Sequence, residues 1–170
     1  MLGLYPGNAI TDKTHELIEA CKVSLLDRGF GQKSGANGSG WGKANKVNLW
    51  ARAKDGNRAY SLLRELINKN IVPNLWDFHP PYQMDGNCGY TSGVCEMLCY
   101  SSDDIIELLP ALPEEWKNGS VKGLCARGGY SLDFTWENGE IKSLSVYSSC
   151  GKKTARIKTG DEIKTVKTVG

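Results

Sequence analysis

The chain has 170 residues, enough for one domain or two small ones with a genuine hydrophobic core. Its 21 basic and 19 acidic side chains leave a formal charge of +2, which gives no reason to expect nucleic acid as a partner. No apolar run is long enough to span a bilayer, and Met1 is not followed by a signal-peptide pattern. Taken alone, these features favour the cytosol.

A helix is predicted after a turn-rich start at residues 3–8. Thr11 or Asp12 can cap its beginning, and Gly29 is expected to end it. The apolar residues between these points form a single stripe, which predicts that one face is buried. The members of this stripe are Leu17, Ile18, Cys21 and Leu25.

Two further helices are predicted after the glycine-rich loop at residues 31–40. In the first, residues 41–54, apolar side chains nearly encircle the axis, which indicates burial on several sides. Asp55 or Asn57 can cap the second, which has the clearest helical periodicity in the chain. Its apolar residues are Ala59, Leu62, Leu63, Leu66 and Ile67. The short links between these helices imply antiparallel neighbours.

Residues 74–89 are predicted to be an irregular loop before a fourth helix at residues 91–101. Two consecutive prolines remove backbone donors, and two glycines permit unusual backbone angles. The loop also holds Asp77, His79 and Asp85 among several aromatic side chains, which is typical of a pocket wall. The alternative is that Pro-Pro and Asp-Gly only punctuate a turn between helices.

The apolar period changes from helix to strand in the last third of the chain. Residues 130–137 alternate apolar and polar side chains, which predicts a half-buried strand, and Asn138-Gly139 predicts a hairpin. A bulge is expected near Lys142 or Ser143, where the alternation slips. A second hairpin is predicted at residues 160–161, with basic side chains protecting an edge strand. Helices followed by strands predict two units that meet near residues 101–104.

The six cysteines could form three disulfides. Several stand where a small apolar residue would serve, for example Cys95 and Cys99, and this pattern favours buried, reduced thiols. A zinc site would combine them with His79 or Cys88. The spacing lacks the close Cys-x-x-Cys pairs of structural zinc sites, so we predict neither a metal nor a cofactor.

An ordered set of short motifs makes the chain resemble glycoside hydrolase family 95, the α-1,2-L-fucosidases and related α-L-galactosidases, from Leu2 to about Gly151. The motifs are Leu4-Tyr5-Pro6-Gly7-Asn8, Asn48-Leu49-Trp50-Ala51-Arg52, His79-Pro80-Pro81, Asp85-Gly86-Asn87, Glu96-Met97-Leu98, Leu108-Leu109-Pro110-Ala111-Leu112-Pro113 and Ala126-Arg127-Gly128-Gly129. The resemblance implies that residues 1–101 are the last helices of an (α/α)6 barrel and that residues 102–170 form a small antiparallel β-domain. Trp41, Asn48, Trp50 and Arg52 would then be barrel core.

The resemblance also implies roles for residues of the central loop. Asp85 matches the aspartate that acts as general base in an inverting hydrolysis, where base and acid stand about 6.5–9.5 Å apart so that a water fits between base and sugar. His79 and Asn87 would contact sugar hydroxyls, and Trp76 or Tyr82 would cover an apolar sugar face. The alternatives are that His79 braces the Pro-Pro turn and that Asp85 only forms a turn.

The family's general-acid glutamate and water-orienting asparagines match positions upstream of these 170 residues. A general acid contributes about 10²–10⁴ in rate, so the chain is expected to be almost inert alone. The expected partners are a fucosylated or L-galactosylated oligosaccharide and the N-terminal part of the barrel, with no nucleic acid and no membrane segment. Relatives are often exported, which leaves the location open. The alternatives are a non-catalytic carbohydrate-binding or interaction module, or a fragment of a truncated gene.

Overall fold

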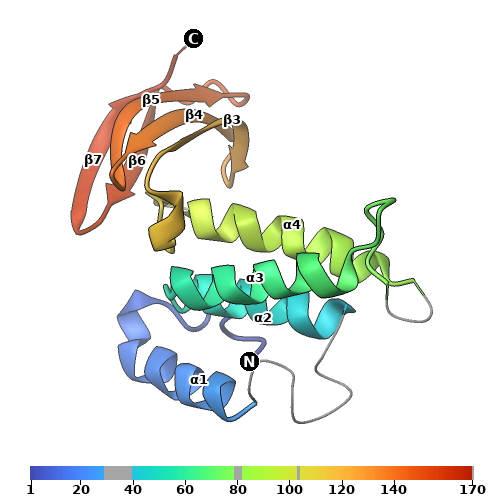
Figure 1. Cartoon of the computed structure of the whole chain (residues 1–170). Coiled ribbons are helices and arrows are strands. Elements are labelled where there is room, and N and C mark those ends of the chain that lie inside the picture. The colour runs from blue at the N-terminus through green and yellow to red at the C-terminus, as the bar shows by residue number, and fades with distance from the viewer. Residues whose placement is uncertain (29–39, 79–81, 103, 170) are drawn as a thin grey trace.

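The computed structural model describes residues 1–28, 40–78, 82–102 and 104–169 (Figure 1). Within these ranges, helices come first and strands follow, which confirms the predicted fold class. The helices are α1 (His15–Asp27), α2 (Gly40–Arg52), α3 (Gly56–Asn70) and α4 (Met84–Leu98), with short 3-10 helices at Asp12–Thr14 and Glu114–Trp116. The strands are β1 (Cys99–Ser101), β2 (Ile106–Leu108), β3 (Gly119–Ala126), β4 (Tyr130–Glu137), β5 (Glu140–Ser148), β6 (Thr154–Thr159) and β7 (Glu162–Lys167). None of these helices is long and apolar enough to cross a membrane.

Helix α2 is the centre of the helical part because it packs against both α3 and α4. Its near-continuous apolar surface explains this position: Val47, Trp50 and Ala51 are all at most 2% exposed. Asp55 caps α3 as predicted, its Oδ1 accepting a hydrogen bond from the Arg58 amide. Trp41 departs from the prediction of core, since it is 45% exposed at the start of α2.

The predicted loop at residues 74–89 is wrong at its end, because α4 begins at Met84 and the following glycines are helical. Each glycine lies where another element comes too close for a side chain. A Cβ on Gly89 would lie 2.8 Å from the Ala44 side chain, and one on Gly93 would lie 2.6 Å from Val47. Close packing of α4 on α2 therefore outweighs the low helix propensity of glycine. The helix ends at Leu98, so the predicted helical residues 99–101 form strand β1.

The β region contains two sheets above one end of α4 (Figure 1). In the antiparallel sheet β3-β4-β5, Leu132, Phe134 and Trp136 are buried, which confirms the predicted alternation. The Asn138-Gly139 hairpin is also confirmed, with positive φ at both residues. The bulge falls at the predicted place on β5.

The second sheet has the order β1-β2-β6-β7 and includes the second predicted hairpin, between β6 and β7. Its β2–β6 pairing is parallel, so the β region is not antiparallel throughout as expected. The two sheets share one core, in which Ile106 and Ile157 of one sheet lie with Phe134 and Val146 of the other. The predicted boundary near residues 101–104 stays a prediction.

The cysteines differ from the prediction in their burial. All six are free thiols, but only Cys21 is fully buried. Burial, with the nearby Glu96 carboxylate, raises the pKa of the Cys99 thiol to about 12, so it stays protonated at neutral pH. The exposed thiols are Cys88, Cys95, Cys125 and Cys150. Among the described residues, no three His, Cys, Asp or Glu side chains gather as a metal site.

Candidate functional site

Asp85 is exposed in the first turn of α4. The positive end of a helix dipole favours a negative charge at this position, and solvent reaches the carboxylate, as a general base requires. Asp85 does not line either of two clefts that the described residues form, one at the junction of the helices with the β region and one beside β6 and β7. His79, which was predicted on the same loop, lies outside the described residues.

Three residues around Asp85, which we call the α4 clamp, join the preceding loop to the first turns of the helix: Asp77, Gly86 and Asn87. Asp77 is fully buried, and a Cβ on Gly86 would lie 1.5 Å from its Oδ2 atom. The Asn87 Oδ1 atom accepts a hydrogen bond from the Asp77 amide at 2.8 Å, and its Nδ2 atom donates to the Leu75 carbonyl at 2.8 Å. The clamp gives a physical reason for the sequence Asp-Gly-Asn, because Gly86 leaves room for Asp77 and Asn87 holds the loop. The predicted sugar contact of Asn87 stays a prediction.

The α4 clamp also fixes an exposed aromatic pair. Trp76 and Tyr82 lie with ring centroids 4.9 Å apart and planes inclined by 32°. They are 54% and 40% exposed, and Phe78 and Met84 beside them in the chain are exposed as well. The structure therefore brings two predicted sugar-facing aromatics to the end of α4 that carries Asp85. Such a surface suits the apolar face of a pyranose ring.

We expect replacement of Asn87 by alanine to loosen the loop that carries this pair. The loss of two hydrogen bonds outweighs the gain in helix propensity, and the free energy of unfolding should fall by about 1 kcal/mol. Amide hydrogen exchange followed by NMR should show the Asp77 N–H exchanging faster than in the wild type. The neighbouring exposed Cys88, changed to alanine, is the control and should leave that exchange rate unchanged; equal rates in the Asn87 variant would contradict the clamp.

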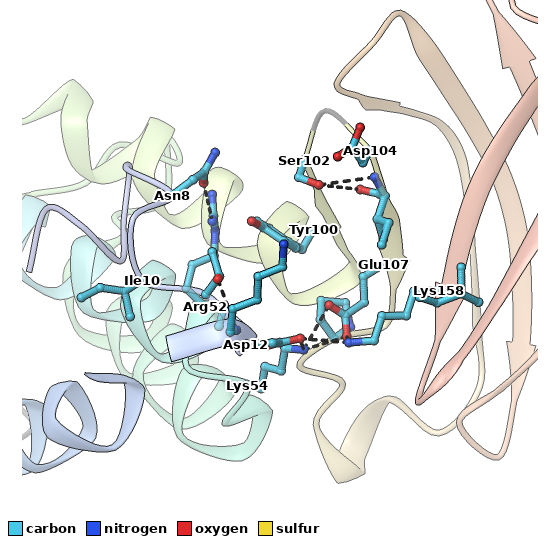
Figure 2. Close-up of a pocket in the computed structure, with 16 residues that line it drawn as sticks. Asn8, Ile10, Asp12, Arg52, Lys54, Tyr100, Ser102, Asp104, Glu107 and Lys158 are labelled. Carbon is cyan, nitrogen blue, oxygen red and sulfur yellow. Dashed lines mark hydrogen bonds and ion pairs between the residues drawn. The ribbon is translucent and has the colours of Figure 1, made fainter. Parts of the chain in front are cut away.

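A cleft lies at the other end of α4, between the helices and the β region (Figure 2). We call it the junction cleft. It has a volume of about 560 Å³. Its walls come from the N-terminal turn, the end of α2, and strands β1, β2, β6 and β7 with the turns beside them. The lining includes Asn8, Ile10, Arg52, Tyr100, Asp104 and Ile163.

Four charged side chains form an ion cluster in the junction cleft. Lys54 and Lys158 each contact both Asp12 and Glu107, at N–O distances between 2.6 and 3.1 Å. Burial alone would raise the pKa of Asp12, but the hydrogen bonds from the two lysines outweigh it and hold the pKa below its ordinary value of 3.8. Burial would likewise lower the pKa of Lys158, whereas its two carboxylate partners raise it. The cluster links the N-terminal segment, the end of α2 and strands β2 and β6.

This depression predicts how Asp12 contributes to stability with pH. Its ionic contacts add stability above the unfolded pKa near 3.9, and that contribution is lost as pH falls through the lower folded pKa. We expect the Asp12→Asn variant to be less stable than wild type at pH 7 and to approach it below about pH 4. Urea denaturation between pH 3 and 7 measures the difference. Asp27→Asn, exposed at the end of α1, is the control, and a D12N difference that grows on acidification would contradict the sign.

Sequence reasoning missed several polar residues that the structure buries. Asn48, expected as core, is an interior hydrogen-bonding residue: its Nδ2 donates to the Gly89 carbonyl at 2.8 Å, and its Oδ1 accepts from Ser92 at 3.0 Å. Arg52 contacts Glu96 and Asn8, and its guanidinium stacks over the Tyr100 ring in the junction cleft. Polar residues on an otherwise apolar helix were the available sign of such contacts.

Two protein-family models together match almost the whole chain. The model of the Glycosyl hydrolase family 95 catalytic domain matches residues 1–98, and that of the Glycoside hydrolase family 95 C-terminal domain matches residues 100–169. These matches place the chain among the glycosidases. It belongs to glycoside hydrolase family 95, which confirms the resemblance read from its motifs.

Three similar proteins are named as fucosidases. The chain is 34% identical to Alpha-L-fucosidase 2 of Arabidopsis thaliana over 161 residues, which are 87% of this chain and 18% of that protein. It is 32% identical to Probable alpha-fucosidase A of Aspergillus oryzae, covering 81% and 22% of the two chains. For Probable alpha-fucosidase A of Aspergillus niger, the identity is 30% and the coverage 93% and 22%. The chain thus spans about a fifth of the length of these relatives.

Proposed function

We propose that this chain supplies the general-base end of an inverting exo-glycosidase that releases α-L-fucose, or L-galactose, from glycans. The observation that carries the proposal is Asp85 itself, an exposed carboxylate on the first turn of α4, at the same end of the helix as the Trp76–Tyr82 ring pair. Family membership and the fucosidase names of the three relatives support the same chemistry.

In this proposal, Asp85 accepts a proton from a water that attacks the anomeric carbon from the face opposite the leaving group. A glutamic acid outside these 170 residues protonates the leaving oxygen, about 6.5–9.5 Å from the base. Trp76 and Tyr82 cover an apolar sugar face, while His79 and Asn87 contact hydroxyls. The α4 clamp keeps the position of Asp85 constant relative to the aromatic pair.

The proposal divides the work between two parts of a barrel, so a polypeptide of these 170 residues alone should not hydrolyse a glycoside. The test is a chimera in which the matching fifth of the Arabidopsis relative is replaced by this chain. We expect the chimera to release fucose from a fucosyl-α-1,2-galactoside and the 170-residue polypeptide to release none. Turnover by the polypeptide alone, or a folded chimera without turnover, would overturn the proposal.

A non-catalytic carbohydrate-binding role is the competing function, favoured by the same exposed aromatic pair. The two differ in what Asp85 does. If binding is the whole function, the folded chimera should be inactive both with Asp85 and without it. Changing Asp85 should also leave the affinity of the chimera for the oligosaccharide unchanged.

A further inference from the structure

The junction cleft is a concave surface, distinct from the Asp85 end of α4. Glu96, which holds Arg52 against the cleft, comes eleven residues after Asp85 on the same helix, which places it roughly 16 Å farther along the axis. The cleft volume of about 560 Å³ lies within the range of small-molecule sites, about 300–1,000 Å³. Its position between two parts of the chain is also where such sites commonly occur.

The charges of the cleft are balanced, which decides what kind of ligand it can take. The two lysines of the ion cluster are matched by the two carboxylates they contact. Arg52 is matched by Glu96 through two hydrogen bonds. The remaining charged side chains of the lining, Lys13 and Asp104, have opposite signs. With Glu96 counted behind Arg52, the four basic side chains of the lining meet four carboxylates, and this balance favours a neutral ligand over a phosphate or a polycation.

The lining nevertheless offers hydrogen-bonding groups to such a ligand. Among the described residues, the Tyr100 hydroxyl has no hydrogen-bond partner, and Figure 2 shows it on the same side of the cleft as Asn8 and Arg52. Asn8 uses its Oδ1 atom to accept from Arg52 at 3.0 Å, which leaves its amide NH₂ group for another acceptor. The three donors of the Lys54 ammonium are engaged by Asp12 and Glu107, whereas Lys158 contacts two carboxylate oxygens and so keeps one of its three donors. The carboxylates keep further lone pairs.

Aliphatic side chains complete the lining at both ends. Ile10 of the N-terminal turn and Ile163 of β7 stand among the polar groups of the cleft. Arg52 covers one face of the Tyr100 ring, with its Cζ atom 4.4 Å from the ring centroid. A pyranose likewise carries both hydroxyls and apolar C–H faces, which would match the polar and the aliphatic groups of this lining.

We propose that the junction cleft binds a neutral, hydroxyl-rich ligand, of which a carbohydrate unit is the matching class, independently of the Asp85 end. Binding here needs no catalytic group and is a property of the 170-residue chain itself. The site would hold part of a glycan about one helix length away from the proposed point of hydrolysis. Its existence does not depend on the role proposed for Asp85.

The test is an NMR titration of the whole chain, labelled at the isoleucine methyl groups and with nitrogen-15 at the backbone and indole N–H groups, with the neutral trisaccharide 2′-fucosyllactose. We expect saturable shifts of the Ile10 and Ile163 methyl signals and no such shifts with inorganic phosphate. Tyr100→Phe keeps the stacked ring and removes only the hydroxyl, so it should weaken binding by roughly three- to tenfold, the effect of one hydrogen bond. Tyr147→Phe, on the exposed side of β5, is the matched control and should leave the dissociation constant unchanged.

Each other outcome overturns the proposal. Shifts confined to the Trp76 indole would place sugar binding on the aromatic loop and would support the proposed function without the second site. Saturable phosphate binding at Ile10 and Ile163 would show that the cleft selects anions. The absence of saturable shifts with the trisaccharide at any soluble concentration would show that the cleft binds no such glycan, whatever the chimera does.

Discussion

Replacing Asp85 by asparagine in the chimera should lower kcat by about 10²–10⁴-fold, the usual contribution of a general base. Asparagine has the size of aspartate but cannot accept the proton of the attacking water. The KM should change little, because the change does not remove the groups proposed to bind the sugar.

The control for this prediction is Asp161→Asn, an exposed aspartate in the turn between β6 and β7. It makes the same chemical change far from α4 in the sequence and should leave kcat as in the unaltered chimera. Equal activity of the Asp85 and Asp161 variants would remove Asp85 from the mechanism. Thermal unfolding of both variants shows whether a loss of activity is a loss of fold.

The second large effect is expected at Gly86, where alanine should lower the free energy of unfolding by about 3 kcal/mol. Alanine is the better helix former, so propensity alone predicts a gain of about 1 kcal/mol. The geometry reverses the sign, because the new methyl group would coincide with the buried carboxylate of Asp77. Urea denaturation of the 170-residue chain measures the change.

A double-mutant cycle isolates the cause of that loss. Shortening Asp77 to alanine leaves its Cβ as the nearest atom, 3.1 Å from the methyl group of alanine at position 86. In this background the Gly86→Ala change should cost less than about 1 kcal/mol, because the two residues share one space. Equal costs in both backgrounds would show that the α4 clamp is not what requires a glycine there.

Local patterns in the sequence determine much of the observed fold. The alternation over β4, the hairpin at Asn138-Gly139 and the bulge on β5 depend on residues close in sequence, so period and turn chemistry were sufficient to predict them. The stripe of α3 was predicted correctly in four of its five members: Ala59, Leu62, Leu63 and Leu66 are at most 4% exposed. The fifth, Ile67, is 44% exposed, which contradicts the prediction.

Features that depend on distant neighbours could not be predicted in this way. The glycines at the start of α4 were assigned to a loop, because glycine is a poor helix former. They are required there because α2 and Asp77 approach the helix too closely for a side chain, and the sequence alone does not show this approach. The parallel pairing of β2 with β6 joins segments that are separated in the chain by three other strands, and no periodicity reports such a partner.

The sequence predicted which residues belong to the candidate site better than it predicted the buried contacts that hold them in place. Motif order selected Asp85, and the structure places Trp76 and Tyr82 at the same end of α4. Asp77 was expected in a pocket wall, whereas it is buried beneath Gly86. The structural role of such a residue follows from its burial and its tertiary hydrogen bonds, and both can be seen only in the three-dimensional structure.

The order of strands in the sheet of β1, β2, β6 and β7 has a consequence during protein synthesis. Ile106 on β2 pairs with Ile157 on β6, which is synthesised 51 residues later (157 − 106). The edge of β2 therefore stays unpaired until β6 has been made. Until the ribosome has released that segment, the nascent chain presents an open β edge next to finished helices. Chaperone capture or premature degradation should therefore concentrate on chains stalled between these two points.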